Sequence, residues 1–291
     1  MPTLHIILGP TGVGKTDYAL ALARRVGSPV VSCDSRQVFR EMRIGTARPT
    51  DEQLASVRHY FIADRSVTEP FTAGQFEVEA LALLDKLFRD HDTVVMAGGS
   101  GLYIDALCNG LDDFPAADPE LRAQLSRRLR EEGVAALRAE LRILDPESYA
   151  TLDPANGQRI VRALEVTLAT GRKFSSFKTH ANKERPFSIE KTGLIRPRAE
   201  LYARIDARVD AMMAEGLLEE ARRLLPQRSL PALNTVGYKE LFDYFDGRCD
   251  LAEAVRLVKR NTRHYAKKQL TYWGRDASIN WIELPAAACA Q

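Results

Sequence analysis

Eight residues near the amino terminus constrain this chain more than any others. Gly9–Thr16 reads GPTGVGKT and matches every fixed position of the G-x-x-x-x-G-K-[ST] phosphate-binding motif. The apolar run Leu4–Leu8 predicts a buried parallel strand before it, and Asp17–Val26 carries apolar residues at helical spacing after it. A strand, a glycine-rich loop and a helix in this order surround phosphate oxygens with backbone N–H groups and the positive end of the helix. We therefore predict that the chain binds a diphosphate or a triphosphate.

The motif also assigns roles within the loop. Lys15 is expected to neutralise phosphate charge, and the Thr16 hydroxyl is expected to hold Mg²⁺. A chance match is the alternative, but a loop matching by chance would not be flanked by a strand and a helix. The predicted phosphate-binding residues are Gly9, Pro10, Thr11, Gly12, Val13, Gly14, Lys15 and Thr16.

Composition narrows the class of protein. The 291 residues are 45% hydrophobic and 27% charged with a net charge of +2, as in ordinary soluble globular proteins. The cysteines form no C-x-x-C pair, which argues against a zinc site and for a reducing compartment; they are Cys33, Cys108, Cys249 and Cys289. The first strand leaves no room for a signal peptide, and no apolar run approaches about 18 residues. We expect a cytoplasmic protein without a membrane span.

Further apolar runs predict the rest of a parallel sheet. Thr72–Gln75 has the spacing of a capping box and should open a helix. The expected strands after the first are Pro29–Ser32, His59–Ile62, Thr93–Ala97 and Ser188–Ile195.

Residues 114–186 contain helix signals but no strand signal. Asp118-Pro119, Asp145-Pro146 and Asp153-Pro154 each predict a helix start, because proline is favoured at the first helical position. The third helix should end at Gly171.

The elements together predict an α/β fold, with a P-loop NTPase-like parallel sheet flanked by helices and an all-helical insertion. We assign residues 1–113 and 187–291 to the core domain and residues 114–186 to the insertion.

The C-terminal third is predicted to be helical. Its stretch from Arg256 to Arg275 holds no acidic residue. Helical spacing places one set of side chains toward the core, namely Val255, Val258, Thr262 and Tyr265. The opposite face carries Arg256, Arg260, Arg263 and Lys267. We also expect core or interface positions for Tyr265, Tyr272 and Trp273.

A second basic face belongs to the insertion and the loop after it. It comprises Arg159, Arg162, Arg172, Lys173, Lys178, Lys183 and Arg185. Two basic faces beside a phosphate site favour a polyanionic second substrate, with nucleic acid the first choice. The alternative is that both are simply solvated helix faces.

The stretch Asp34-Ser35-Arg36-Gln37 follows the second predicted strand. Ligands of open α/β sheets lie beyond the carboxyl ends of the strands, so Asp34 should share a crevice with the phosphate loop. In a kinase or hydrolase Asp34 would support Mg²⁺. Alternatively, Gln37 and Asp34 hold an adenine, and Asp34 accepts a proton from its exocyclic amine as that amine attacks.

A set of motifs in fixed order resembles one known family. The motifs are GPTGVGKT, DSRQVFREMRIGTARP, HYFI, FTAGQFEVEALALL, AGGSGLYIDAL, NGQRIVRALEV, RIDARVDAMMAEGLLEE, TVGYKEL and TRHYAKKQLTYW. This order is similar to that of the tRNA dimethylallyltransferases, which prenylate the adenosine 3′ of the anticodon, and it covers roughly Leu4 to Trp273.

The resemblance implies that the loop holds dimethylallyl diphosphate with Mg²⁺ and that an anticodon stem-loop is the partner of a monomeric enzyme. It implies three catalytic residues, with Asp34 as general base, Thr11 near the bridging oxygen of the leaving diphosphate and Lys15 on that diphosphate. It adds Arg208 as a diphosphate partner. The RNA contacts expected with it are Asp34, Ser35, Arg36, Gln37, Ser100, Gly101, Arg122, Gln158, Arg159, Ile160, Val161, Arg162, Arg260 and Arg263.

The chain departs from the family pattern in three places. Ser100 stands where Thr is common, and Gly12-Val13 replaces a commoner Ala-Ser pair. No C-x-x-C…H-x-x-x-H extension follows Trp273, which indicates a bacterial-type enzyme. The alternative function is a small P-loop kinase, with the helical insertion as a lid.

Overall fold

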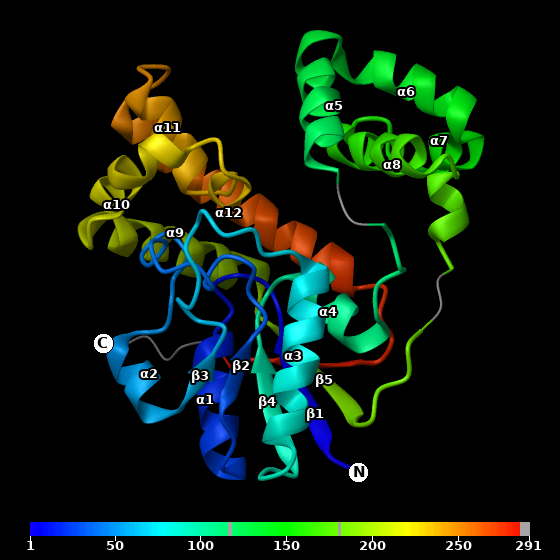
Figure 1. Ribbon diagram of the computed structural model, residues 1–291. Coiled ribbons are helices and arrows are strands. Elements are labelled where there is room, and N and C mark those ends of the chain that lie inside the picture. The colour runs from blue at the N-terminus through cyan, green and yellow to red at the C-terminus, as the bar shows by residue number, and fades with distance from the viewer. Residues whose placement is uncertain (116–117, 180–181, 286–291) are drawn as a thin grey trace. The chain divides into compact units, whose positions relative to one another are not determined.

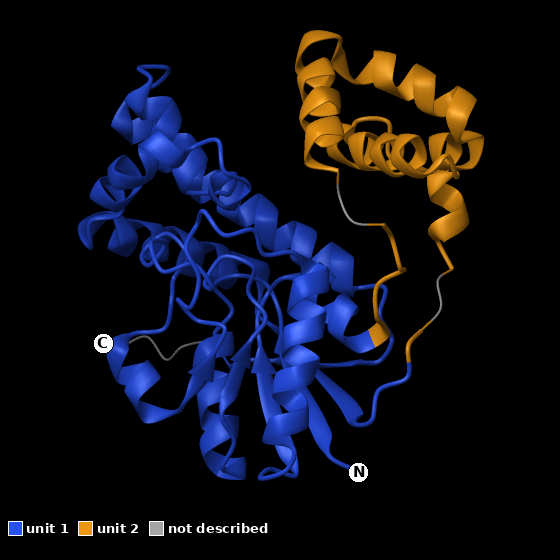
Figure 2. Cartoon of the chain, in the orientation of Figure 1, with its two compact units in different colours: residues 1–108, 184–291 blue, residues 109–183 orange. Residues whose placement is uncertain are grey.

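The computed structural model describes residues 1–115, 118–179 and 182–285. The chain divides into two compact units (Figure 2). Unit 1 comprises Met1–Cys108 and Glu184–Gln291, and unit 2 comprises Asn109–Lys183. In sequence, unit 2 is an insertion into unit 1.

Within the described residues of unit 1, six strands form one parallel sheet in the order β3-β2-β4-β1-β5-β6 (Figure 1). The predicted strands are confirmed, although the third is shorter than expected. The sixth strand was not predicted. The strands are β1 (Thr3–Leu8), β2 (Val30–Ser32), β3 (His59–Tyr60), β4 (Thr93–Ala97), β5 (Ser188–Ile195) and β6 (Ile279–Glu283).

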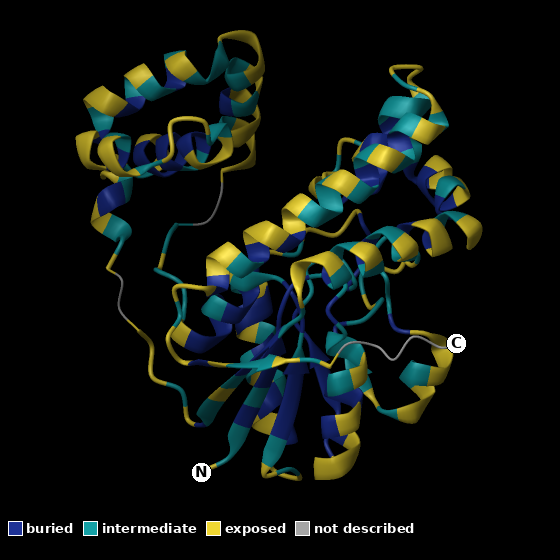
Figure 3. Cartoon of the chain, turned by 180° about the vertical axis from the view of Figure 1, so that it is seen from behind, coloured by how far each residue is buried: buried dark blue, intermediate teal, exposed yellow. Residues whose placement is uncertain are grey.

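Helices flank this sheet, as an all-parallel sheet requires. The predicted capping box is present, because Thr72 Oγ1 accepts from Gln75 N and Gln75 Oε1 accepts from Thr72 N. Figure 3 shows the middle strands buried and the outer helix faces exposed. The helices of unit 1 are α1 (Lys15–Val26), α2 (Asp51–Ser56), α3 (Ala73–Leu87), α4 (Gly101–Asn109, whose last residue lies in unit 2), α9 (Arg198–Ala214), α10 (Leu217–Leu224), α11 (Tyr238–Phe245) and α12 (Leu251–Trp273).

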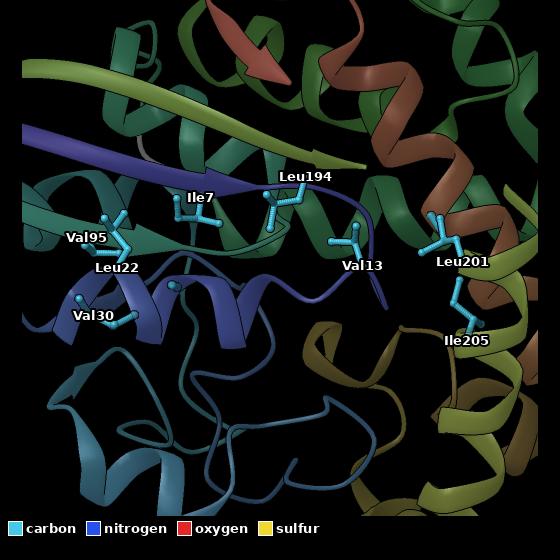
Figure 4. Close-up of a cluster of buried hydrophobic side chains, with 11 residues drawn as sticks. Ile7, Val13, Leu22, Val30, Val95, Leu194, Leu201 and Ile205 are labelled. Atoms are coloured by element: carbon cyan, nitrogen blue, oxygen red, sulfur yellow. The ribbon is translucent and has the colours of Figure 1, made fainter. Parts of the chain in front are cut away.

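One hydrophobic cluster joins the sheet to the phosphate loop (Figure 4). Val13 lies inside the loop, yet its side chain is fully buried. It packs in the same cluster as Leu194 of β5 and as Leu201 and Ile205 of α9. The loop is therefore anchored by core packing as well as by its backbone.

Unit 2 contains α5 (Pro119–Glu131), α6 (Gly133–Leu144), α7 (Pro146–Thr151) and α8 (Gly157–Thr170) around its own core. Asp118 and Asp145 cap α5 and α7 with their side chains, as the two Asp-Pro pairs predicted. The prediction that Asp153-Pro154 starts the next helix is wrong. The Asp153 carboxylate caps a turn by accepting from Ala155 N, and Asn156 caps α8 instead.

The long helix α12 differs from its prediction in two respects. Val258 and Trp273 are buried, but Tyr265 is 43% exposed and Tyr272 is 45% exposed, so neither tyrosine is a core residue and only the interface alternative stays a prediction for them. The basic run also has acidic partners outside the stretch. Asp206 and Asp210 of α9 form ion pairs with its Arg263 and Lys259.

Two further findings concern cysteines and the membrane. Cys33 and Cys108 are buried free thiols and Cys249 is a partly buried one, whereas Cys289 lies outside the described residues. Across the described ranges, none of the helices is both long and apolar enough to cross a bilayer.

Candidate active site

The phosphate loop owes its shape to its glycines. Gly9, Gly12 and Gly14 have φ angles of 148°, 85° and 111°, which side-chain-bearing residues rarely adopt. A Cβ atom on Gly9 would lie 2.7 Å from Leu194 O, and one on Gly12 would lie 2.9 Å from Ile205 Cγ1. Conformation therefore favours glycine at all three positions, and lack of space adds to this at Gly9 and Gly12.

Side chains from distant parts of the chain hold the backbone carbonyls of the loop. Arg196 Nε donates to Val13 O at 2.9 Å, and Arg204 Nε donates to Gly12 O at 3.0 Å. Lys15 Nζ donates to the carbonyls of Gly9 and Pro10 at 2.8 and 2.9 Å. With these carbonyls engaged, the backbone keeps a fixed shape before any ligand arrives.

Gln269 of α12 completes this bracing. Its Oε1 accepts from Thr11 N at 2.9 Å, and its Nε2 donates to Gly99 O at 2.8 Å. The side chain is buried and connects the loop after β1 to the loop after β4. The helices α9 and α12 accordingly lie across the carboxyl ends of the strands (Figure 1).

Two partly buried cations converge on the loop. Burial lowers the pKa of Lys15 to about 8, with the Asp34 carboxylate opposing this shift and Arg208 adding to it. Burial likewise lowers the pKa of Arg208, whose Nη2 donates to the Thr11 hydroxyl. Within the described residues, Arg208 Nε is buried without a hydrogen-bond partner. Two desolvated cations and an unsatisfied donor form a site prepared for an anion.

Asp34 lies in the same cavity as the phosphate loop, as predicted. Its Oδ1 accepts from the backbone N–H groups of Arg36 and Gln37 at 2.9 and 3.3 Å, which fixes the carboxylate at the carboxyl end of β2. The cavity has a volume of about 500 Å³ and is also lined by Thr16, Gln37 and Gln269.

The neighbours of Asp34 are tied down by local bonds. Ser100 Oγ accepts from Ser35 N at 2.9 Å and lies 3.1 Å from Ser35 Oγ. Arg36 Nη1 donates to Ser35 O at 3.1 Å. Gly101 lies directly under the Tyr272 ring, where a Cβ would come within 2.4 Å. Ser100 and Gly101 are thus engaged in the structure of this loop.

Gln37 faces a turn formed by Arg43–Ala47, which we call the acceptor turn. Gln37 Nε2 donates to Thr46 O and to Ala47 O, both at 3.1 Å. Since only an amide nitrogen can donate to two carbonyls, the orientation of this carboxamide is determined. Both of its N–H groups are engaged, and Oε1 remains as the acceptor.

An apolar recess of about 120 Å³ adjoins the main cavity. It shares Thr11, Asp34, Arg208 and Tyr265 with that cavity. Its other walls are largely apolar and include Val209, Met212, Leu217, Val236 and Val258. The recess therefore offers a small hydrophobic group a place beside both the cations and the carboxylate.

A third hollow, which we call the basic groove, runs along α11 and α12. Tyr265 lines the main cavity, the recess and the groove. Burial, followed by the negative charge of Asp34, raises the pKa of the Tyr265 hydroxyl to about 12. The cationic and histidine side chains of the groove are Lys239, His264, Lys267, Lys268 and Arg275. Of the predicted RNA contacts, Arg260 is exposed beside Asn261, whereas Arg263 is paired with Asp206.

In unit 2 the predicted RNA contacts have divergent environments. Gln158 and Arg159 are exposed at the start of α8. Ile160 and Val161 are 1% and 2% exposed, so their side chains belong to the core of the unit, and their contact with RNA stays a prediction.

The two remaining arginines, Arg122 and Arg162, form ion pairs with the buried carboxylate of Glu165. The basic face is also smaller than predicted, because Lys183 pairs with Asp113 and Arg185 pairs with Glu77 inside unit 1.

Sequence reasoning missed several site residues. Gln269, Arg196 and Arg204 reach the loop from far along the chain, and no local motif marks them. A signal did exist for Gln269, because the predicted inward positions Val258, Thr262 and Tyr265 continue at helical spacing to residue 269.

Relatives of known name match nearly the whole chain. The family model for IPP transferase matches residues 37–276. A tRNA dimethylallyltransferase 1 of Porphyromonas gingivalis is 55% identical over 280 residues, covering 96% of this chain and 93% of the relative. A tRNA dimethylallyltransferase of Cytophaga hutchinsonii is 50% identical over 277 residues, covering 95% and 91%.

Solved structures agree with the predicted α/β fold. A full-length tRNA isopentenylpyrophosphate transferase of Bacillus halodurans has a TM-score of 0.71 at 36% identity and covers 97% of this chain and 90% of that one. A eukaryotic dimethylallyltransferase acting on tRNA shares the fold with a TM-score of 0.80 at 23% identity, covering 97% and 74%. From the family model and these relatives together, the chain belongs to the IPP transferase family, as do the bacterial tRNA dimethylallyltransferases that it matches.

Proposed function

We propose that the chain transfers a dimethylallyl group from dimethylallyl diphosphate to the exocyclic N6 amine of the adenosine 3′ of the anticodon, releasing diphosphate. The observation that carries the proposal is one cavity holding the partly buried cations Lys15 and Arg208 together with the carboxylate of Asp34. The relatives named tRNA dimethylallyltransferase support the choice of substrates. The kinase alternative is set aside, because the matching family is one of prenyl transferases.

The diphosphate belongs in the phosphate loop. An allylic diphosphate ionises readily because its developing cation is delocalised, so the protein must mainly stabilise the departing anion. Lys15 and the unsatisfied Nε of Arg208 are placed to do so in a desolvated site. The Thr11 hydroxyl, held by Arg208, is assigned to the bridging oxygen.

The apolar recess suits the five-carbon dimethylallyl group. Its volume of about 120 Å³ is small, and Met212 and Leu217 are among the apolar side chains that line it. An allylic cation is destroyed by water, so an apolar wall also protects the reactive carbon until the acceptor attacks.

Asp34 is assigned as the general base. The C–O bond to the diphosphate breaks, a bond forms from the allylic carbon to N6, and the amine proton passes to the Asp34 carboxylate. Two backbone N–H groups on Oδ1 hold that carboxylate in place. Gln37 Oε1, which accepts no hydrogen bond from the described residues, would accept from the same amine.

The donor set fits a Mg²⁺ ion that is bound together with the diphosphate. Among the described residues, no group of three or more His, Cys, Asp or Glu side chains could hold a metal alone. Mg²⁺ commonly takes only one or two protein ligands plus substrate phosphates. Thr16 lines the cavity and would hold the ion with phosphate oxygens, and the ion would neutralise charge on the leaving group.

The RNA partner is assigned to the basic groove in unit 1 and to the exposed start of α8 in unit 2. A target base inside an anticodon loop must leave its stack to reach Asp34. Tyr265, at the junction of the groove and the cavity, is an exposed aromatic surface for a flipped or neighbouring base. Arg159 carries the corresponding exposed charge in unit 2.

Transfer of labelled dimethylallyl groups to an anticodon stem-loop tests the proposal directly. We expect incorporation at the adenosine 3′ of the anticodon and release of diphosphate in equal amounts. Excess ATP should leave the reaction nearly unchanged. Protection of the site by ATP with no transfer to RNA would instead favour a kinase.

A further inference from the structure

A second turn of backbone N–H groups lies beside the cavity and is closed by a carboxylate of the protein itself. Glu220 of α10 accepts from Arg43 N and Ile44 N through Oε2, at 3.0 and 2.9 Å. Its Oε1 accepts from Gly45 N at 2.9 Å and from the Tyr238 hydroxyl at 2.7 Å. Successive N–H groups of this kind form an anion-binding concavity. Glu220 therefore fills this site permanently.

The arrangement is buried and closely packed. Glu220 is 2% exposed and Tyr238 is fully buried. A Cβ on Gly45 would come within 2.6 Å of the Tyr238 ring, so the turn lies directly on that ring. In the described part of the chain, Glu220 forms no ion pair, and neutral donors alone hold its charge.

The acceptor turn determines the orientation of the Gln37 carboxamide. The carbonyls of Thr46 and Ala47 follow immediately after the N–H groups that Glu220 binds, and both accept from Gln37 Nε2. Ala47 has a φ of 50°, which a non-glycine residue adopts only when its surroundings hold it there. Rotation of the turn would remove both carbonyls and free the carboxamide to flip.

We propose that Glu220 is a positioning residue for acceptor specificity, acting through the acceptor turn to keep Gln37 Oε1 facing the substrate base. An acceptor at that point favours a base with an exocyclic amine and opposes one with a carbonyl there. The inference rests on the proposed function. It adds a specificity device built from a residue that touches neither substrate.

Base discrimination provides the test. Two anticodon stem-loops are compared, one with adenosine at the target position and one with inosine, which replaces the amine by a carbonyl. Wild type should bind the adenosine RNA about tenfold more tightly, as expected for one hydrogen bond gained or opposed. In Glu220→Gln the carboxamide cannot accept from all the donors at this site, and the ratio should fall close to one. Affinity for dimethylallyl diphosphate should be unchanged.

A double-mutant cycle tests whether Glu220 acts through Gln37. Gln37→Ala alone should remove the discrimination, and adding Glu220→Gln should produce no further loss. If Glu220→Gln does not fold, Tyr238→Phe decides, because it removes one donor and keeps the ring and the carboxylate. We expect a partial loss of about two- to threefold in the ratio for that variant.

Asp145→Asn is the matched control. Asp145 is equally buried and also accepts four hydrogen bonds from Ser148 and Ser175 in unit 2, with no cationic partner among the residues that the structure describes. This variant should lose stability but keep the wild-type ratio. Equal affinities in wild type, or an unchanged ratio in the folded variants, would overturn the role of Glu220. Absence of prenyl transfer by wild type would instead overturn the proposed function.

Discussion

The phosphate loop and the acceptor turn are two concavities on one cavity, and only one of them is open. In the loop, Lys15 and Arg208 form no ion pair within the described residues, and Arg208 Nε is buried there without a hydrogen-bond partner. In the turn, Glu220 supplies the anion itself. The comparison shows two uses of a concavity lined by backbone N–H groups. It can bind a ligand when no side chain occupies it, and it stabilises the fold when a carboxylate of the protein does.

The largest expected effect is a loss of turnover without a loss of diphosphate binding. Asp34→Asn keeps the shape and the contact with the backbone N–H groups but removes the proton acceptor. Turnover should fall by about 10²-fold or more in a single-turnover transfer assay. Binding of dimethylallyl diphosphate should be nearly preserved. Near-normal turnover would remove Asp34 from its assigned role.

Removing the Lys15 side chain should weaken diphosphate binding and lower turnover. Lys15→Ala removes a partly buried cation and the donor that holds Gly9 O and Pro10 O. Turnover should fall by about 10²–10³-fold, and the affinity for dimethylallyl diphosphate should fall with it. RNA binding measured without the small substrate should not change. A Kd equal to that of wild type would place the diphosphate elsewhere.

The basic groove should contribute salt-dependent RNA affinity that neither concavity provides. Lys267→Glu with Lys268→Glu should weaken stem-loop binding and flatten its salt dependence by roughly one unit of slope per lost contact. Arg24→Glu with Arg25→Glu, in the last turn of α1, makes the same charge change away from the carboxyl ends of the strands. If both pairs alter the slope equally, the groove is only part of the general surface charge.

At neutral pH the smallest effect is a pH dependence of diphosphate binding to the phosphate loop, which grows only above about pH 8. Diphosphate binds the protonated amine of Lys15, whose pKa is lowered to about 8 in the free protein. Above that pH the protein must take up a proton to bind, so the apparent Kd should rise about tenfold per pH unit, with a plateau below. Calorimetry between about pH 7 and about pH 10 would measure this. Lys15→Arg, which stays charged, should abolish the rise, and a flat wild-type profile would refute it.

The open concavity was predictable from sequence because its requirements are local. Gly9–Thr16 carries its three glycines and Lys15 within eight consecutive residues, and the strand before it is a largely apolar run. The filled concavity was not predictable. Glu220 lies far from Arg43 in sequence, and nothing in its local pattern distinguishes it from a solvated helix residue.

The other differences have similar physical causes. The strand β6 is short and partly exposed, and it becomes a strand by pairing with β5, where Trp281 covers Gly193. The basic run in α12 looked unbalanced because Asp206 and Asp210 lie on another helix. Interactions between distant segments, and not local preferences, determined each of these features.

The contacts that brace the phosphate loop also determine when, during translation, the loop can take its ligand-binding shape. Gly9–Thr16 is among the first segments to leave the ribosome, but Leu194, Arg204 and Gln269 are made long afterwards. Parallel sheets with such distant contacts form late. A nascent chain that stalls before Gln269 therefore carries the whole motif but lacks the side chain that braces Thr11 N and Gly99 O.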